Sequence, residues 1–348
     1  MRPPLVESNP DFGRLRSAVM REGSPDRMPA MELFCDLEIM CSVMGITPAE
    51  FRPLDYIRFQ KAMGYDYLNA EVKLGRDIFT VHDVGEENPD SLAARRTFQD
   101  EHSGPIQGWE ELEAFEWPTV ESSDFSQFDL YAENLPKGMG LIAWVGGFFE
   151  NVSWSTGIET FCYMLADDRP FIERLFEKWG EYVIEVSMAG MDKPSVSAYW
   201  LSDDLGFNSG PFMSPEDNRK LVMPVYAELG RMCKARGIPF ILHSCGKLDS
   251  IMEDLIECGV DCLHSLPPNL YDLAELKRNW GDRLSFAGNI DLNLLSLGSE
   301  EATREAVRAV RTVFESEPRG GVILSSANTV ANYCKVENYL AMMIELLG

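Results

Sequence analysis

Short runs of β-branched and aromatic residues alternate along this chain with longer stretches in which apolar residues recur at helical spacing. The first pattern is typical of buried strands, and the second is typical of amphipathic helices. Eight runs of the first kind occur, at residues 29–33, 65–70, 140–145, 196–202, 239–244, 261–265, 283–289 and 321–326. Because eight parallel strands alternating with helices close into a barrel, the pattern predicts an α/β fold of the (β/α)8 TIM-barrel type.

Local signals mark where one long helix begins and ends. Ser214 is followed by Pro215 and two acidic residues, which is typical of a helix N-terminus. The helix is expected to run to Arg236, with Gly237 as its C-terminal cap. A kink is predicted at Pro224.

Residues 76–138 interrupt the alternation of strands and helices. Pro, Gly, Asp and Ser are frequent there, and only residues 109–115 (WEELEAF) have a helical pattern. This stretch is too long for an ordinary connection between a strand and a helix. We therefore expect residues 1–348 to form a single barrel domain with an irregular insertion after the second strand that passes over the barrel mouth. Composition does not decide whether this insertion is a lid, a dimer contact or a docking surface. A small hairpin subdomain is the alternative.

The charge balance restricts the classes of partner. Against 31 Lys and Arg stand 56 Asp and Glu, a formal net charge of -25, which repels nucleic acid and anionic lipid surfaces. The N-terminal residues lack the apolar core of a signal peptide, and no apolar run approaches the ~20 residues of a membrane span. We expect a cytoplasmic protein, with most of its eight cysteines reduced and buried. The sequence does not predict an oligomeric state.

Polar residues gather where the predicted strands end. Active sites of TIM barrels are built at the C-terminal ends of the strands, and a buried ring of unsatisfied polar groups would be costly in a core. The sequence therefore predicts a site there. The polar residues at these ends are Glu32, Asn69, Glu71, Glu150, Asp203, Asp204, His243, Cys245, His264, Asn289, Asp291, Ser326 and Asn328.

His243 and Cys245 form the sharpest element of this set. Residues two apart on a strand face the same side, so both side chains are expected to enter the barrel mouth, where both suit Zn²⁺. Gly246 would let the chain turn away from a bound ion. The alternative is a hydrogen-bonded core histidine beside a small buried cysteine, because this pair supplies only two of the three protein ligands that a catalytic zinc site usually has.

Several further residues are candidates for supporting roles. Alternation along residues 196–203 predicts that Asp203, rather than Asp204, faces inward as a metal ligand, general base or substrate clamp. His264 is either a residue behind the site or a satisfied histidine under the barrel rim. His82 and His102 lie in the insertion and are expected at the surface.

At these residues the chain resembles the uroporphyrinogen decarboxylase superfamily, which includes the haem-pathway decarboxylase and zinc-dependent methyltransferases that work with corrinoid proteins or coenzyme M. The similarity covers most of the chain, is strongest from residue 200 to 338, and implies the same barrel. The segments that carry it are residues 203–216, 238–246, 259–268, 272–291, 320–328 and 336–338.

The resemblance is closer to the methyltransferase branch. Decarboxylase members carry an arginine-rich segment near the start that holds the porphyrinogen carboxylates, whereas residues 31–40 here contain acids and no arginine. In methyltransferase members a His-x-Cys-Gly element and a later Cys or His hold zinc. His243 and Cys245 match the first two ligands, but Asn328 stands at the third. The resemblance thus implies that an acid, such as Glu32, Glu150 or Asp203, completes the site, or that zinc is weakly held or absent.

The hypothesis from the sequence is a zinc-dependent methyltransferase that moves a methyl group between a small methylated donor and a corrinoid protein or a thiol acceptor. His243 and Cys245 would bind the metal, with Asp203 as third ligand or base. Glu32, Glu150, Asn69, Asn289, Asp291 and Asn328 would line the pocket or orient the substrate. The alternatives are a decarboxylase or other lyase that needs no metal and acts on a small carboxylate or tetrapyrrole, and a non-catalytic binding protein. The sequence does not name the methyl donor, the acceptor or the reaction direction.

Overall fold

Seven parallel strands form one sheet in the computed structural model, which describes residues 9–75, 81–83 and 97–348. The order of the strands in the sheet follows their order in the chain, as expected of repeated βα units. Their positions agree with seven of the eight predicted runs. The strands are β1 (Tyr67–Val72), β4 (Gly140–Gly146), β5 (Val196–Ser202), β8 (Phe240–His243), β9 (Cys262–His264), β10 (Ser285–Ile290) and β11 (Val322–Ser326).

The eighth predicted strand, residues 29–33, lies between β11 and β1. It forms one parallel bridge, between Ala30 and Leu324 of β11. On its other side the Tyr67 hydroxyl donates to the Glu32 carbonyl at 2.7 Å, and the Asn69 amide donates to the Leu33 carbonyl at 2.8 Å. Side chains of β1 therefore replace a strand ladder at this position, and the described residues form the predicted (β/α)8 barrel.

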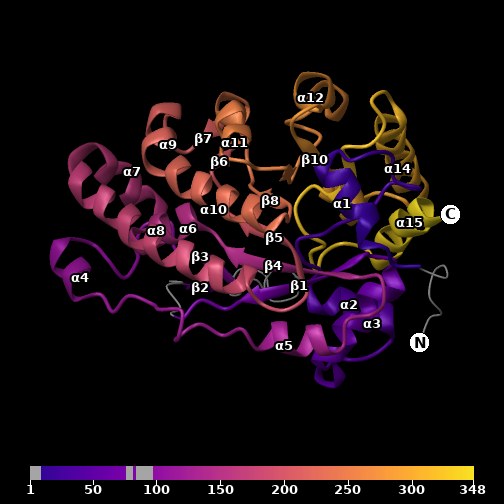
Figure 1. The fold of residues 1–348 in the computed structure, drawn as a ribbon, viewed down its shortest axis with the longest axis horizontal. Coiled ribbons are helices and arrows are strands. Elements are labelled where there is room, and N and C mark those ends of the chain that lie inside the picture. The colour runs from indigo at the N-terminus through magenta and orange to yellow at the C-terminus, as the bar shows by residue number, and fades with distance from the viewer. Residues whose placement is uncertain (1–8, 76–80, 84–96) are drawn as a thin grey trace.

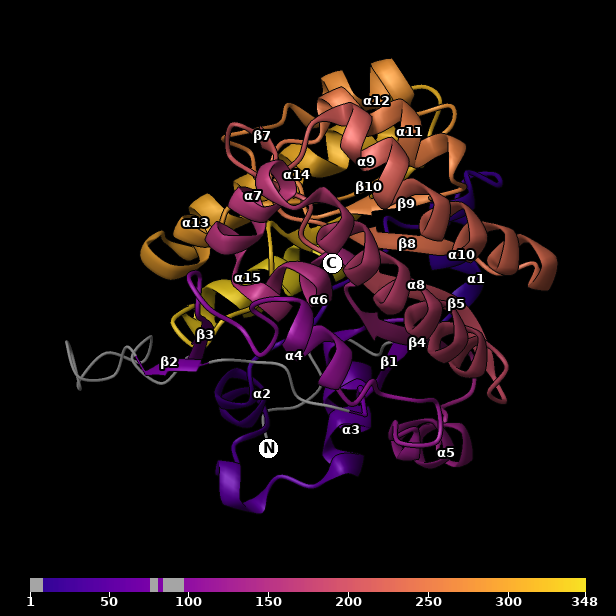
Figure 2. The same cartoon turned by 90° about the vertical axis from the view of Figure 1, so that its left-hand side faces the viewer.

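Helices pack around the outside of the sheet (Figures 1 and 2). They belong to the repeating units, with additions at the N-terminus and after β4. Their bounds are α1 (Phe12–Met20), α2 (Leu37–Met44), α3 (Pro53–Met63), α6 (Phe148–Thr156), α7 (Ile158–Asp167), α8 (Arg169–Met191), α9 (Pro215–Leu221), α10 (Met223–Arg236), α11 (Met252–Glu257), α12 (Leu273–Trp280), α13 (Leu292–Leu297), α14 (Glu300–Glu315) and α15 (Val336–Leu347). Two short 3₁₀ turns, η1 (Pro48–Glu50) and η4 (Asp249–Ile251), and a small hairpin of β6 (Gly206–Phe207) and β7 (Gly210–Pro211) complete this part.

The predicted helix over residues 214–236 is confirmed, with a break in place of a kink. Ser214 caps α9 by accepting a hydrogen bond from the Asp217 amide at 3.0 Å. Helix α10 begins one residue before Pro224, because proline lacks the N–H that would continue the preceding helix. Gly237 ends α10 with a φ of +66°.

Large side chains fill the inside of the barrel. Tyr67, Trp200 and His264 are all buried, and the ring of Trp200 lies 6.5 Å from that of Tyr67 and 5.5 Å from that of His264, between centroids. A filled interior is typical of this architecture. A small molecule therefore has room only above these side chains, at the C-terminal ends of the strands.

The predicted insertion at residues 76–138 contains structure of its own, although its residues 76–80 and 84–96 lie outside the described part. An antiparallel hairpin pairs β2 (Val81–Asp83) with β3 (Thr97–Gln99). Two short helices follow, α4 (Trp109–Ala114), at the predicted place, and α5 (Ser126–Glu133). Within the described residues, no helix is both long and apolar enough to cross a membrane.

Candidate active site and metal centre

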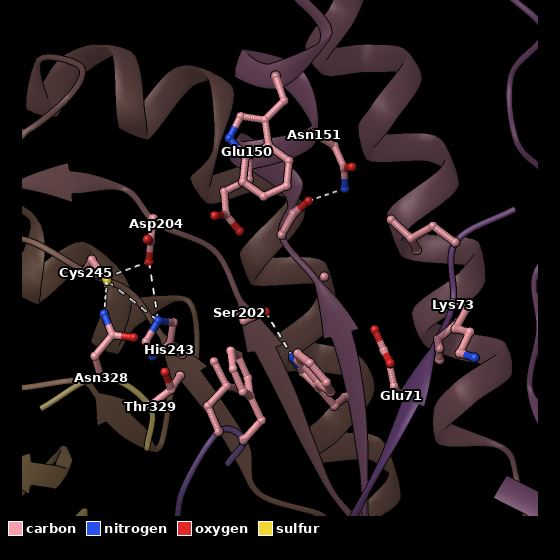
Figure 3. A pocket seen from close by; sticks show the side chains of 18 residues that line it. Glu71, Lys73, Glu150, Asn151, Ser202, Asp204, His243, Cys245, Asn328 and Thr329 are labelled. Atoms are coloured by element: carbon pink, nitrogen blue, oxygen red, sulfur yellow. Dashed lines mark hydrogen bonds and ion pairs between the residues drawn. The ribbon is translucent and has the colours of Figure 1, made fainter. Parts of the chain in front are cut away.

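A cavity of about 630 Å³ lies at the C-terminal ends of β1, β4, β5 and β8 (Figure 3). This volume falls in the range of about 300 to 1,000 Å³ that small-molecule sites occupy. Its lining combines apolar walls with a few polar groups. The labelled polar residues are Glu71, Lys73, Glu150, Asn151, Ser202, Asp204, His243, Cys245, Asn328 and Thr329.

His243 and Cys245 enter this cavity together, at the end of β8. His243 is the last residue of the strand, and its Nε2 lies 3.7 Å from Sγ of Cys245. The next residue, Gly246, has a φ of +91°, a conformation that favours glycine. A Cβ at Gly246 would lie 2.2 Å from the carbonyl carbon of Gly206, so only glycine lets the chain turn away here.

Asp204 is the third member of the cluster. Its Oδ1 lies 3.5 Å from Nε2 of His243 and accepts a hydrogen bond from the backbone N–H of Cys245 at 2.7 Å. The ligand atoms of Asp204, His243 and Cys245 all lie within 4.8 Å of one another. Figure 3 shows the three side chains converging at one end of the cavity.

These three donor atoms suit zinc in kind and in spacing. Sulfur, imidazole nitrogen and carboxylate oxygen are the ligands that zinc binds, and two ligands of a tetrahedral zinc ion lie about 3.4 to 3.6 Å apart, given zinc–ligand distances of about 2.0 to 2.3 Å. The separations of 3.7 Å (Sγ to Nε2) and 3.5 Å (Oδ1 to Nε2) are close to this spacing. Three protein ligands leave a fourth position for a substrate, as in catalytic zinc sites.

The protonation of the cluster depends on a cation. Burial raises the pKa of the Cys245 thiol, and the nearby Asp204 carboxylate raises it further. Burial also lowers the pKa of His243, so its imidazole is neutral at neutral pH. Because a coordinating divalent cation deprotonates a thiol, the buried thiol beside an acid becomes a thiolate only when such a cation is bound.

Asn328 also contacts the cluster, although an amide is a poor zinc ligand. Its Nδ2 donates a hydrogen bond to Sγ of Cys245 at 3.2 Å. A donor in this place stabilises negative charge on the sulfur. Asn328 thus contacts the cysteine as a donor, and Asp204 is the third residue of the cluster that could hold a metal ion, in place of the ligand that the resemblance implies at residue 328.

Asp203 lies behind the cavity rather than in it. Its carboxylate accepts hydrogen bonds from the backbone N–H groups of Phe149 and Glu150, both at 2.9 Å, and from the Tyr226 hydroxyl at 2.7 Å. Burial raises its pKa to about 6, and the three donors limit that rise. Strand β5 ends at Ser202, so strand alternation no longer decides which of the two following residues faces inward.

Two further acids and three aromatic rings complete the cavity. Burial raises the pKa of Glu150 well above its usual value, and Asp204 and Asp203 contribute. Burial also raises the pKa of Glu71, an effect that Lys73 opposes. The aromatic lining residues are Phe34, Trp144 and Trp154.

The other predicted site residues lie apart from this cavity. The Glu32 and Asn69 side chains are buried and are not among the residues that line this cavity. Asn289 and Asp291 line a second hollow of about 470 Å³, where Asp291 caps α13 by accepting from the Asn293 N–H.

The remaining histidines occupy three different settings. His264 is fully buried and contacts His243, which agrees with the alternative that places it behind the site. His102 is exposed and bonded to Glu159, as expected of a surface residue. The side chain of His82 lies outside what the structure describes.

Sequence reasoning missed the roles of two kinds of residue. Strand alternation predicts Asp203 rather than Asp204 as the inward residue, but β5 ends at Ser202, so alternation does not reach either aspartate. Phe34, Trp144 and Trp154 were not singled out, although Trp144 is a strand residue close to the C-terminal end of β4. Its position on that strand was the available signal.

Known proteins resemble this chain in sequence and in fold. The profile of the uroporphyrinogen decarboxylase (URO-D) family matches residues 123–346. A methylcobamide:CoM methyltransferase from Methanosarcina barkeri is 31% identical over 102 residues, which span 29% of this chain and 27% of that protein. A methyltransferase from Methanosarcina mazei superposes with a TM-score of 0.67 at 15% identity, over 95% of this chain and 96% of that one, which shows the same fold.

Both named relatives are methyltransferases, in agreement with the predicted closer resemblance to that branch. The family profile covers well over half of the chain and includes β4, β5 and every strand from β8 to β11. It also includes all three members of the Asp204, His243 and Cys245 cluster. This chain belongs to the uroporphyrinogen decarboxylase family.

Proposed function

We propose that the protein is a zinc-dependent methyltransferase that moves a methyl group between a small methylated donor and a corrinoid or thiol acceptor. The observation that carries the proposal is the cluster of Asp204, His243 and Cys245 at one end of a cavity of about 630 Å³. The partial similarity to a methylcobamide:CoM methyltransferase supports the same chemistry and suggests which donor and acceptor to test first.

The three clustered side chains would hold the metal through Nε2 of His243, Sγ of Cys245 and Oδ1 of Asp204. A bound zinc ion supplies Lewis acidity there, either lowering the pKa of a thiol or polarising the leaving heteroatom of the donor. The Asn328 amide holds the Cys245 sulfur in place through its hydrogen bond. The aromatic walls surround the reacting groups and exclude water, which strengthens the electrostatic interactions in the cavity.

Glu150 is the proposed proton donor. Its pKa is raised well above that of an exposed carboxyl group, so Glu150 keeps its proton to a higher pH and can transfer it to the heteroatom that loses the methyl group. Asp203 acts through Glu150, because the Asp203 carboxylate accepts a hydrogen bond from the backbone N–H of Glu150 and fixes the start of α6. Asp203 is therefore a positioning residue in this proposal.

The charges of the cavity favour this function over decarboxylation of a polyanionic tetrapyrrole. Glu71 and Asp204 line it beside the Glu150 carboxyl group, and Lys73 is the one lysine or arginine among those lining residues that the structure describes. Carboxylate groups of a substrate would meet like charges there, which disfavours binding. A neutral or cationic methyl donor has no such penalty.

Transfer between methylcobalamin and 2-mercaptoethanesulfonate tests the proposal. The zinc-loaded protein is expected to convert methylcobalamin in the presence of the thiol, with a loss of its absorbance that a Cys245→Ser variant does not produce. The reverse arm offers cob(I)alamin with methylated amines, thiols and ethers. Absence of methyl transfer in both directions, in a protein shown to contain zinc, would contradict the proposed activity.

A further inference from the structure

A line of buried hydrogen bonds leads from His243 away from the cavity and into the barrel. Nδ1 of His243 lies 2.7 Å from Nδ1 of His264, and Nε2 of His264 lies 2.8 Å from Oγ of Ser325. The Ser325 hydroxyl lies 3.3 Å from Oε2 of Glu32, so the line ends on a buried carboxyl group. It crosses the barrel through residues at the ends of β8, β9 and β11.

Each link of this line requires one hydrogen between its two atoms. The two rings face each other through their Nδ1 atoms at 2.7 Å, and a neutral imidazole carries a single N–H, so one ring donates to the other. The Ser325 hydroxyl also has a single hydrogen. The direction of donation must therefore be the same at every link.

The two possible directions have opposite consequences for the cavity. If Ser325 donates to Glu32, His264 donates from Nε2 and His243 donates from Nδ1, which leaves the Nε2 lone pair of His243 facing Cys245 and Asp204. If Ser325 donates to His264 instead, the hydrogen of His243 lies on Nε2. A protonated nitrogen cannot bind a metal ion.

We propose that Glu32, as the terminal acceptor of this line, is a positioning residue that fixes His243 in the tautomer with a free Nε2. The inference rests on the metal site of the proposed function, and it extends that site to a residue that does not touch the cavity. A carboxylate has no hydrogen to donate, so it imposes one direction on the whole line. Other metal-binding histidines are oriented in the same way by partners of their second nitrogen.

The surroundings of Glu32 support the role of acceptor. Besides Ser325, the backbone N–H of Ser326 donates to Oε1 at 2.7 Å and the Ser326 hydroxyl lies 2.6 Å from Oε2. Three donors therefore converge on the carboxyl group. Burial nevertheless raises its pKa to about 8, so full ionisation requires mildly alkaline solution or a nearby cation.

Glu32→Gln is an isosteric test, because the protein itself fixes the orientation of the new amide. The backbone N–H of Ser326 needs an acceptor at the Oε1 position, so the amide oxygen must lie there. The NH₂ group then takes the Oε2 position and donates to Ser325. Ser325 must in turn donate to His264, which reverses the line. Ser326→Ala is the matched control, since it removes another partner of Glu32 and leaves the line intact.

Long-range ¹H–¹⁵N correlation spectra of ¹⁵N-histidine-labelled, metal-free protein report the tautomer directly, and the chain has only four histidines. At about pH 9, where the Glu32 carboxyl is largely ionised, wild type and Ser326→Ala should show the hydrogen of His243 on Nδ1, and Glu32→Gln should show it on Nε2. Zinc affinity by chelator competition should fall about 10- to 100-fold in Glu32→Gln only.

An unchanged His243 tautomer in Glu32→Gln, or a wild-type His243 with its hydrogen on Nε2, would overturn the inference. The experiment separates this inference from the proposed function. If the tautomers change as expected but wild-type protein binds no zinc, the role of Glu32 in setting the tautomer stands and the zinc mechanism fails. If zinc binds and the tautomer of the variant does not change, the metal site of the proposed function stands and the role of Glu32 fails.

Discussion

Two adjacent aspartates, Asp203 and Asp204, have different surroundings and therefore different proposed roles. Asp204 faces the ligand atoms of His243 and Cys245, whereas Asp203 accepts three hydrogen bonds behind the cavity. Asp204→Asn keeps an acceptor for the Cys245 N–H but replaces an anionic ligand with a weak neutral one. We expect a loss of zinc affinity of more than about 100-fold, because even partners of ligands are worth about 10- to 100-fold. Chelator competition measures it.

Asp203→Asn is the matched control, because we expect it to lower the unfolding free energy, whereas Asp204→Asn lowers the zinc affinity. In this variant an amide nitrogen replaces one carboxylate oxygen of residue 203, so one of the three groups that donate to Asp203 loses its acceptor. This loss costs about 1 to 3 kcal/mol of unfolding free energy. Urea unfolding should show this loss for Asp203→Asn and less than half of it for Asp204→Asn. Equal destabilisation by both variants would mean that the two aspartates do not differ in this way.

The buried carboxyl of Glu32 predicts a pH dependence of stability. Its pKa is raised to about 8 from 4.5, so the folded state holds the proton more tightly than the unfolded state. The resulting stabilisation is present below about pH 4.5 and is lost as the pH rises through about 8. Its neighbours with raised pKa values, which stay neutral at neutral pH, are Cys35, Cys334, Tyr65, Tyr67 and Tyr339.

Comparison with Glu32→Gln isolates this effect, because the variant cannot ionise at that position. Between about pH 5 and pH 9, wild type should lose on the order of 1 to 4 kcal/mol of unfolding free energy relative to the variant. Urea unfolding at several pH values measures the difference. A constant difference across this range would show that the carboxyl titrates normally.

At the scale of single residues, the sequence predicted His243 and Cys245 but not their partner. Their spacing on a strand is a local property, so it can be read from the chain. The choice between Asp203 and Asp204 depends on where β5 ends, because the chain leaves the strand geometry after Ser202. The link from Glu32 to His264 joins residues far apart in the chain, and one sequence carries no local signal for such a contact.

The start of α6 is held against the end of β5 by a close approach at Gly147. A Cβ on Gly147 would lie 2.3 Å from Oδ1 of Asp203 and 2.7 Å from the carbonyl oxygen of Ser202. Gly147→Ala should therefore displace the turn that carries Glu150 and cost about 1 to 3 kcal/mol of unfolding free energy. Urea unfolding measures the cost, and zinc-dependent methyl transfer should fall with it.

Gly108→Ala provides the matched control for this element. Gly108 also precedes a helix, α4, but the nearest atom to an added Cβ lies at 3.4 Å, an ordinary contact. The variant should keep the wild-type stability to within about 0.5 kcal/mol. If both variants behaved alike, the close approach at Gly147 would not be the cause.

Elements were more predictable than side-chain contacts. The runs that became β5 and β11 are short, apolar and bounded by polar residues, so their positions are visible in the sequence. Residues 29–33 were predicted as an ordinary strand, but pairing there depends on neighbours from both ends of the chain. Within residues 76–138 the helix α4 was predicted, but the positions of β2 and β3 were not, because no periodicity marks these two short strands.

At the scale of the whole molecule, the count of strands and the spacing of motifs both led to the barrel. The barrel follows from the repetition of strand and helix along the chain, which a single sequence displays, and the family profile agrees with this fold. The cavity, in contrast, is formed by residues from several strand ends, and its apolar walls become apparent only once the strands are placed side by side. The proposed reaction depends on this assembly of distant residues.

Metal content of the purified protein tests the central claim most directly. Elemental analysis should find about one zinc per chain in wild type, as for a site with three protein ligands, and almost none in a His243→Ala/Cys245→Ala variant that keeps the wild-type circular dichroism spectrum. Absence of metal in wild type, even after incubation with zinc, or equal zinc in both proteins, would contradict the proposed metal centre.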